Sequence, residues 1–261
     1  MRAFRVAYDG TGYHGFQRQP DVPTVEGELL AALDALGVSE GTPPGYAAAG
    51  RTDRGVSALA QTVAFEAPDW LTPRALNGEL PAEVRAWASA NAPAGFHATH
   101  DATRRRYRYH LHAPDADEGR AREACAALSG SHDVHNLTPD DTGTERHLEV
   151  SLNADPPFLV VEVAAGGFPR QFVRRAVGLV AAVARGERDD VERVLSAEPL
   201  EGPDGVAAAA PEPLVLVDVA YPDLAFERDP EAAASAREVF RERRAQRLAG
   251  ARVAGTVLDG L

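Results

Sequence analysis

The sequence is poor in several residue types, and each shortage excludes a class of protein. Cysteine occurs once, at Cys125, so an intrachain disulfide and a zinc site built on two or more cysteines are both excluded. No apolar run is long enough to cross a bilayer, and residues 1–6 begin a strand-like pattern where a signal-peptide core would stand. We therefore expect a cytoplasmic protein with no membrane segment.

Lysine and isoleucine are absent, so all 27 basic residues are arginine, and the formal net charge is −12. A GC-rich coding sequence explains both absences. An acidic, lysine-free surface is also typical of proteins from a high-salt cytoplasm, where a screening length of about 3 Å weakens repulsion from other anions. We therefore expect a halophilic source.

Charge is distributed unevenly along the chain. Residues 101–112 hold four arginines against one acid, and residues 166–188 hold five arginines against one acid. Residues 189–204 hold six acids against one arginine. This segregation is typical of an acidic protein with a basic cleft, and solvated charged faces without a partner are the alternative.

The segment Gly50–Val56 (GRTDRGV) places one carboxylate, Asp53, between Arg51 and Arg54, in a polar loop between two apolar runs. Nearby positive charge favours the ionised carboxylate, and an ionised Asp on a tight loop can attack an electron-poor carbon. Turns also favour Asp and Gly, so a surface turn with a local ion pair is the plainer interpretation of this segment.

Period-two and helical patterns alternate along the chain, which indicates an α+β protein. Thr24, Thr72-Pro73 and Asp229-Pro230 are typical helix starts. Strands are expected at residues 2–8, 61–65, 84–88, 105–112, 147–152, 158–164 and 214–220. Helices are expected at residues 25–36, from 72 onward, and at 117–128, 168–185, 190–195 and 227–249.

Four segments in order resemble the motifs of the tRNA pseudouridine synthase A family. They are Tyr8–Gln19, the Gly50–Val56 loop, Phe96-His97-Ala98 followed by Arg105–Tyr109, and Gly167–Gly178. Together they cover most of residues 1–221 and, with the acidic composition, suggest a haloarchaeal member. The resemblance implies the pseudouridine synthase fold. In that fold, two similar halves share a mainly antiparallel sheet, with helices on one face and a central active-site cleft. We expect the halves to span residues 1–103 and 104–261.

The resemblance implies that Asp53 is the catalytic nucleophile. It also implies that Tyr107 packs against the target base, that Arg174 pairs with the nucleophile, and that Arg51 either fills the space left by the extruded base or pairs with Asp53. Arg18, Arg105 and Arg106 are candidates for contacts with RNA phosphates, which position RNA without reading its sequence.

The implied activity is conversion of uridine to pseudouridine in the anticodon stem-loop of tRNA, at positions 38, 39 or 40. Because this isomerisation neither adds nor removes atoms, we expect no cofactor. The family implies a homodimer with RNA spanning both subunits. A non-catalytic tRNA-binding or folding module is the alternative. An Asp-nucleophile glycosidase is a third possibility, although that chemistry normally uses two carboxylates.

Two further features bear on the site. His132 and His135 would share one face of a helix, but no third ligand is nearby, so we expect no metal site. Ser57 stands where the family often has histidine, and the segment between Tyr109 and His132 is shorter than in bacterial members, which bears on substrate choice.

Overall fold

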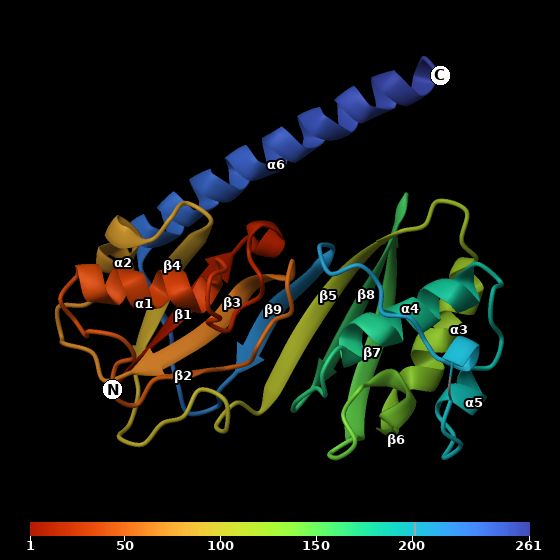
Figure 1. Ribbon diagram of the computed structural model, residues 1–261, viewed down its shortest axis with the longest axis horizontal. Coiled ribbons are helices and arrows are strands. Elements are labelled where there is room, and N and C mark those ends of the chain that lie inside the picture. The colour runs from red at the N-terminus through yellow and green to blue at the C-terminus, as the bar shows by residue number, and fades with distance from the viewer. Residues whose placement is uncertain (201) are drawn as a thin grey trace.

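The computed structural model describes residues 1–200 and 202–261, and it shows a ten-stranded sheet with helices packed on it (Figure 1). The strands are β1 (Arg2–Tyr8), β2 (Ala47–Ala48), β3 (Ser57–Phe65), β4 (Val84–Asn91), β5 (Arg104–His112), β6 (Gly130–Asp133), β7 (Glu145–Asp155), β8 (Phe158–Ala165), β9 (Leu214–Ala220) and β10 (Glu227–Arg228). The α-helices are α1 (Val25–Ala35), α2 (Pro73–Glu79), α3 (Glu118–Leu128), α4 (Phe172–Ala184), α5 (Val191–Val194) and α6 (Pro230–Asp259). Short 3₁₀ turns are η1 (Gly10–Gly12), η2 (His135–Leu137) and η3 (Gly202–Asp204).

The strand order is β10-β4-β1-β3-β9-β5-β8-β7-β6, with β2 paired to β3. Among the described residues every pairing is antiparallel except that of β3 with β9, which spans two residue pairs, Ser57 with Val215 and Ala58 with Leu216. This short parallel contact joins the two halves of the sheet. The α+β class with a mainly antiparallel sheet is confirmed.

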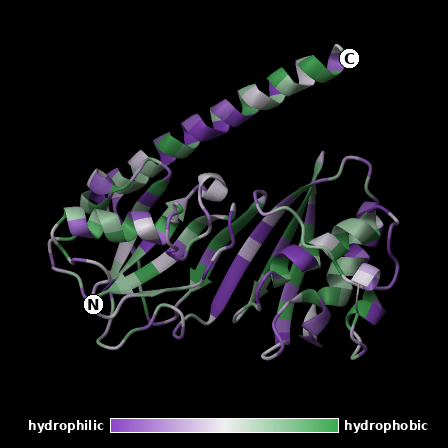
Figure 2. Cartoon of the chain, in the orientation of Figure 1, coloured by the Kyte–Doolittle hydropathy of each residue, from purple (hydrophilic) through white to green (hydrophobic). Residues whose placement is uncertain are grey.

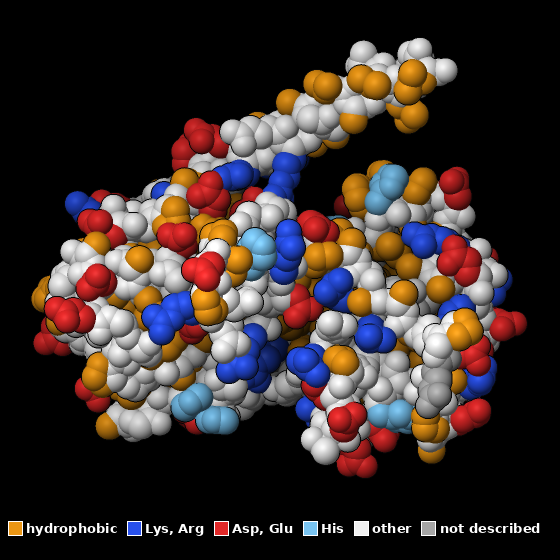
Figure 3. Space-filling view, viewed as in Figure 1, with side chains coloured by type: hydrophobic (Ala, Val, Ile, Leu, Met, Phe, Trp, Pro, Cys, Tyr) orange, Lys and Arg blue, Asp and Glu red, His pale blue; other side chains and the backbone are white. Residues whose placement is uncertain are grey.

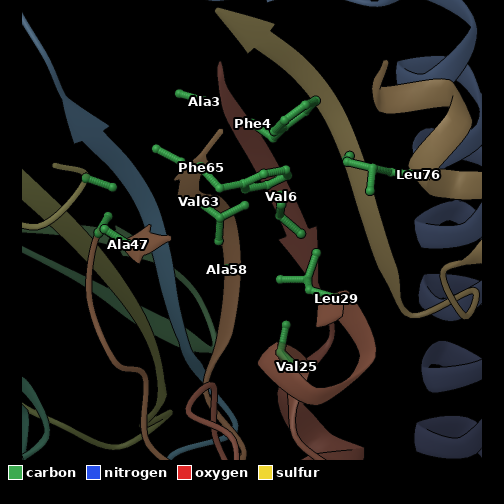
Figure 4. Close-up of a cluster of buried hydrophobic side chains, with 14 of the residues drawn as sticks. Ala3, Phe4, Val6, Val25, Leu29, Ala47, Ala58, Val63, Phe65 and Leu76 are labelled. Carbon is green, nitrogen blue, oxygen red and sulfur yellow. The ribbon is translucent and has the colours of Figure 1, made fainter. Parts of the chain in front are cut away.

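The N-terminal half is held by α1 on one face of β1 and β3. Phe4, Val6 and Val63 meet Val25 and Leu29 of the helix, and all five are buried (Figure 4). The helix begins where expected because the Thr24 hydroxyl accepts a hydrogen bond from the Gly27 amide at 3.2 Å. Burying an apolar stripe against a sheet in this way supplies most of the stability of such a helix.

The C-terminal half has its own core, in which α3 and α4 pack on β5, β7 and β8. The expected helix at 168–185 was wrong at its start, since α4 begins at Phe172. Gln171 at the N-cap has a left-handed φ of 57°. A right-handed helix therefore cannot run back through this residue to residue 168.

The last part of the chain returns to the N-terminal half. The expected boundary at residue 103 falls in the connection between β4 and β5. Strand β10, which follows this boundary in the sequence, nevertheless pairs with β4 of the N-terminal half. Arg5 also stacks over the Phe226 ring, 4.2 Å from its centroid. Helix α6 starts at Pro230, capped by the Asp229 carboxylate, and runs to Asp259, ten residues past the expected end at 249.

Two further differences concern single elements. His132 lies on strand β6, which the sequence did not predict, and His135 opens η2, so the two histidines do not share a helix face. Across residues 1–200 and 202–261 no helix has the length and apolar character needed to cross a bilayer. Nor does any group of three His, Cys, Asp or Glu side chains in those residues converge as metal ligands would.

Candidate active site

Asp53 lies on a tight turn between β2 and β3, with its side chain 39% exposed. The amide of Val56 donates to the Asp53 carbonyl at 3.1 Å and closes the turn. Gly55 has φ of 82°, and a Cβ there would stand 3.1 Å from Cγ of Pro211. Glycine is required at this point by both its backbone conformation and its neighbour. The carboxylate is thus presented at the surface of a rigid loop.

The N-terminal motif supports this loop from behind. The amide of Phe16 donates to the Thr52 carbonyl at 3.0 Å, and the hydroxyls of Tyr8 and Thr52 share a hydrogen bond of 2.8 Å. Gly15, with φ of 97°, passes so close that a Cβ would lie 2.9 Å from the same carbonyl. Tyr8 is fully buried, and burial raises the pKa of its phenol, which therefore stays protonated.

Ser57 has a specific part in this packing. Its hydroxyl accepts a hydrogen bond from the Gly10 amide at 3.0 Å. Gly10 itself approaches the loop so closely that an added Cβ would lie 2.0 Å from the Val56 carbonyl oxygen. Ser57, which stands where the family often has histidine, therefore links the loop at Gly10 to the Asp53 loop through a hydrogen bond.

Helix α4 of the other half brings Arg174 to Asp53. Its Nη1 donates to Oδ2 of Asp53 at 3.2 Å, and its side chain is 19% exposed. Its Nε donates to the Ala209 carbonyl at 2.8 Å, while the Ala209 amide donates to the Arg174 carbonyl at 2.9 Å. Gly178 lets this segment pass, because a Cβ there would lie 2.1 Å from the Ala207 carbonyl oxygen. The guanidinium is therefore fixed in orientation before any substrate binds.

Tyr107 lies on β5 at the junction of the two cores and is partly buried. Its ring meets Phe168 edge-on, with centroids 5.5 Å apart, and Phe168 in turn stacks on Phe172. Burial raises the pKa of Tyr107 to about 12, while nearby Arg105 lowers it and the Asp53 carboxylate raises it by smaller amounts. At neutral pH the phenol is uncharged and lies within the field of the Asp53 carboxylate.

Arg105 is an internal residue. It is 9% exposed, and its guanidinium donates to the carbonyls of Ala49, Thr99 and Gly166. Burial lowers its pKa from the ordinary value. These contacts join the segment before the Asp53 loop to the segment that leads into α4. The geometry makes Arg105 a brace between the two halves and leaves it few donors for a phosphate.

The other arginines named from the sequence are more dispersed. Arg51 and Arg18 are exposed. Arg106 and Arg108 both pair with Glu162, at 3.6 and 2.5 Å, and strand alternation puts them on the opposite face of β5 from Tyr107. The structure therefore brings together Asp53, Arg174 and Tyr107, and it does not bring Arg105 or Arg106 to the Asp53 carboxylate.

Two residues near the site were not singled out from the sequence. Phe168 supports the Tyr107 ring, and its signal was the Gly167-Phe168 pair within the fourth motif. Arg170 is exposed and pairs with Asp140 at 2.6 Å, and the Asp53 carboxylate contributes to the field that raises its pKa. Figure 3 shows many arginine side chains along the middle of this face, between the two halves.

Comparison with known proteins defines the class. Residues 124–222 match the family model described as tRNA pseudouridine synthase, so the fold is that of a pseudouridine synthase. A crystal structure of a Cbf5-Nop10-Gar1 complex is 11% identical, with a TM-score of 0.34 over 69% of this chain and 54% of that chain, which is too weak a likeness to carry an argument.

The curated relatives resolve the family further. Proteins named tRNA pseudouridine synthase A are 66% identical in Natronomonas pharaonis, over 98% of both chains, and 59% identical in Haloarcula marismortui, over 100% of both. One in Methanothrix thermoacetophila is 42% identical over 87% of this chain and 85% of its own. The chain belongs to the tRNA pseudouridine synthase A family, a family of isomerases. The haloarchaeal relatives agree with its acidic, lysine-free composition.

Proposed function

We propose that the protein converts uridine to pseudouridine in tRNA, with Asp53 as the nucleophile. The observation that carries this proposal is the ion pair of Asp53 with Arg174, made across the two halves and near the partly buried ring of Tyr107. A plain surface turn would have no reason to receive an arginine from a helix in the opposite half.

The reaction breaks the bond between C1′ of the ribose and N1 of uracil, turns the base, and joins C1′ to C5. The proton leaves C5 and N1 gains one, so no atom is gained or lost and no cofactor is required. The Asp53 carboxylate adds to C6 of the base or to C1′ of the sugar, or it takes a proton from C2′ to give a glycal. Each route needs an ionised, oriented carboxylate, which the charge and the fixed position of Arg174 favour.

Tyr107 and Arg51 have supporting roles in this proposal. The Tyr107 ring offers a surface for the extruded uracil, whose stacking in the RNA has been lost. Its phenol, kept neutral by burial, can donate a hydrogen bond or assist removal of the C5 proton. Arg51 is exposed beside the loop and can fill the space that the base vacates. Extrusion costs a few kcal/mol and least where pairing is weak, which suits a target near the loop end of a stem.

We further propose that the target lies in the anticodon stem-loop, at positions 38, 39 or 40, that the enzyme acts as a homodimer, and that it works in the cytoplasm. Exposure leaves Arg18 and Arg170 as the better candidates for contacts with RNA phosphates. The departures at Ser57 and before His132 bear on which tRNAs fit.

The test is to incubate unmodified tRNA with the protein in molar salt and to map pseudouridine by chemical labelling and primer extension. We expect modification by the wild type and none by Asp53→Ala. Abasic sites would instead identify a glycosidase, and tight binding without product would identify a non-catalytic module. Modification elsewhere in the tRNA would contradict the assignment to the anticodon arm but leave the chemistry intact.

A further inference from the structure

Helix α6 has no part in the chemistry described so far, yet its middle turns lie beside the N-terminal motif. Its first turns pack on the N-terminal half through the buried side chains of Ala232, Ala233 and Ala236. Farther along, the helix projects away from the sheet, and its residues are exposed from position 248 onward, with only Gly255 partly covered (Figure 1). Figure 2 shows hydrophilic turns between these two parts. The attachment of α6 beyond its first turns therefore depends on polar side chains.

A cavity of about 540 Å³ lies between the middle of α6 and the sheet, so apolar packing is incomplete there. Its apolar lining comes from the sheet residues Leu59 and Val215 and the helix residues Phe240 and Leu248. At the cavity, two arginines of α6 reach the other side, where Arg243 pairs with Glu83 and Arg247 pairs with Asp9. The Asp9 amide donates to the Glu83 carbonyl at 3.0 Å. Both arginines therefore converge on one point of the N-terminal half.

The pair of Arg247 and Asp9 joins an exposed cation to a buried acid. Nη2 of Arg247 donates to Oδ2 of Asp9 at 2.5 Å, and the two side chains are 58% and 4% exposed. Oδ1 of Asp9 accepts from the amide and the hydroxyl of Thr11, at 3.1 and 2.7 Å. Burial raises the pKa of Asp9, but the hydrogen bonds from Thr11 and the charge of Arg247 outweigh it and hold the pKa below its ordinary value. A buried, ionised carboxylate without its cation is costly, so this pair fixes the place of Asp9.

Asp9 begins the segment 9–16, which holds the Asp53 loop on both sides of the carboxylate. Three hydrogen bonds join the two: Gly10 amide to Ser57 hydroxyl at 3.0 Å, Gly55 amide to Tyr13 carbonyl at 3.3 Å, and Phe16 amide to Thr52 carbonyl at 3.0 Å. Thr52 precedes Asp53 in the chain, whereas Gly55 follows it. A continuous set of contacts therefore runs from α6 through Asp9 to the proposed nucleophile.

We propose that Arg247 is a positioning residue for the isomerisation. Through Asp9 it fixes the segment 9–16, and through that segment it fixes the direction in which the Asp53 carboxylate faces Arg174. The inference rests on the function proposed above and gives α6 a part in catalysis without contact with the reacting base. Because Arg247 is 58% exposed, its loss should cost little global stability. The reaction is more sensitive, since a displacement of about 1 Å far from the chemistry can lower a rate by about 100-fold.

Single-turnover kinetics on tRNA separate positioning from binding. We expect Arg247→Ala to lower the rate at saturating tRNA roughly 5- to 20-fold and to leave Kd for tRNA within about twofold of the wild type. Both contacts of Arg247, to Asp9 and to the Thr11 hydroxyl, use Nη2 alone, so Arg247→Lys should recover most of the rate.

The matched control is Arg244→Ala, which removes another exposed arginine of α6. Arg244 lines the same cavity and makes no ion pair within residues 1–200 and 202–261, so its loss should change neither the rate nor Kd. A weaker Kd with an unchanged rate in Arg247→Ala would show that Arg247 binds RNA phosphates, and it would overturn the positioning role.

A double-variant comparison tests the route through Asp9. Asp9→Asn removes the charge that Arg247 binds, so the double variant Asp9→Asn with Arg247→Ala should be no slower than the slower single variant. Losses that multiply would mean that Arg247 acts by another route, and the proposal would fail.

Amide hydrogen exchange tests the same contacts without any activity. In Arg247→Ala we expect exchange at the amides of Gly10, Phe16 and Gly55 to be at least about tenfold faster, with the global unfolding midpoint unchanged and with no such effect in Arg244→Ala. Unaltered exchange at these three amides would overturn the inference. A wild type that modifies no tRNA would overturn the proposed function instead, and the exchange result would stand.

Discussion

Glycine has opposite structural effects in the loops around Asp53 and at the end of α6. Gly10 and Gly178 lie where an added Cβ would meet a carbonyl oxygen at 2.0 and 2.1 Å. Gly250 and Gly255 lie in the exposed last turns of α6, residues 248–261, here called the arm. They have no atom within 4 Å of such a Cβ among the described residues. In the first region glycine is required because two backbones touch, whereas in the second it weakens a helix that nothing covers.

The two regions differ in what fixes their conformation. Around Asp53 the position of each atom follows from contacts within one chain, including the buried hydroxyls of Tyr8 and Thr52. The conformation of the arm lacks such support, so it depends on what binds to it. The following predictions test where this difference holds, from the largest expected effect to the smallest.

The largest effect, a loss of kcat, is expected from a change at Asp53 itself. Asp53→Asn keeps the size of the side chain and an acceptor for Arg174 but removes the attacking charge. We expect kcat on tRNA to fall by more than about 10³-fold with little loss of RNA affinity. Asp34→Asn, on the exposed side of α1, is the control. Single-turnover rates within tenfold of wild type would remove Asp53 from the chemistry.

A smaller loss of kcat is expected when Arg174, the ion-pair partner of Asp53, is no longer held in one orientation. Arg174 binds both Asp53 and the Ala209 carbonyl, and a lysine cannot reach both. We expect Arg174→Lys to lower kcat roughly 10- to 100-fold. Arg175→Lys, whose parent side chain makes a hydrogen bond of 2.9 Å to the Val206 carbonyl, is the matched control. Equal rates for both variants would contradict the orienting role.

Stability should also distinguish the two regions. Gly10→Ala forces a Cβ against the Val56 carbonyl, and we expect it to lower the free energy of unfolding by about 2 kcal/mol or more. Gly12→Ala, two residues away with nothing within 4 Å of its Cβ, should change it by less than about 0.5 kcal/mol. Denaturant midpoints of the pair measure the difference, and equal midpoints would show that the loops can separate.

Because burial raises the pKa of Tyr107, we expect its contribution to the free energy of unfolding to fall at alkaline pH. Its folded pKa of about 12 lies above the ordinary value of 10.0, so folding favours the neutral phenol. This contribution is complete below pH 10 and is lost as pH rises toward 12. Over that interval we expect Tyr107→Phe to lose about 2 kcal/mol less unfolding free energy than the wild type. Parallel pH curves for the two proteins would show that the phenol is solvated.

The smallest effect is expected in the arm. Gly250→Ala meets no neighbour and replaces a poor helix former with the best one. We expect a gain of up to about 1 kcal/mol in local helix stability, seen as slower amide hydrogen exchange in residues 248–259, with the global unfolding midpoint unchanged. A fall in the midpoint would mean that the arm packs closely against its own chain.

Much of the local structure was predictable because it depends on near neighbours. Side chains at Thr24, Thr72 and Asp229 cap helices as expected, and the alternation of Tyr107, Tyr109 and Leu111 gives one buried face of β5. The start of α4 and the short strand β6 were not predicted, because a left-handed residue and an edge pairing with β7 decide them.

The sequence alone determined the acidic and lysine-free character and most helices and strands, because these depend on residue type and short-range pattern. The family, and with it the candidate residues Asp53, Tyr107 and Arg174, came from the resemblance of four motifs to a known family. The resemblance implied that Arg174 pairs with Asp53, and the structure adds the geometry of that contact across 121 residues. Only the tertiary structure decided that Arg105 donates to three backbone carbonyls and that the last turns of α6 are exposed. Those outcomes follow from which backbones touch, and contacts between distant segments leave no periodic trace in the chain.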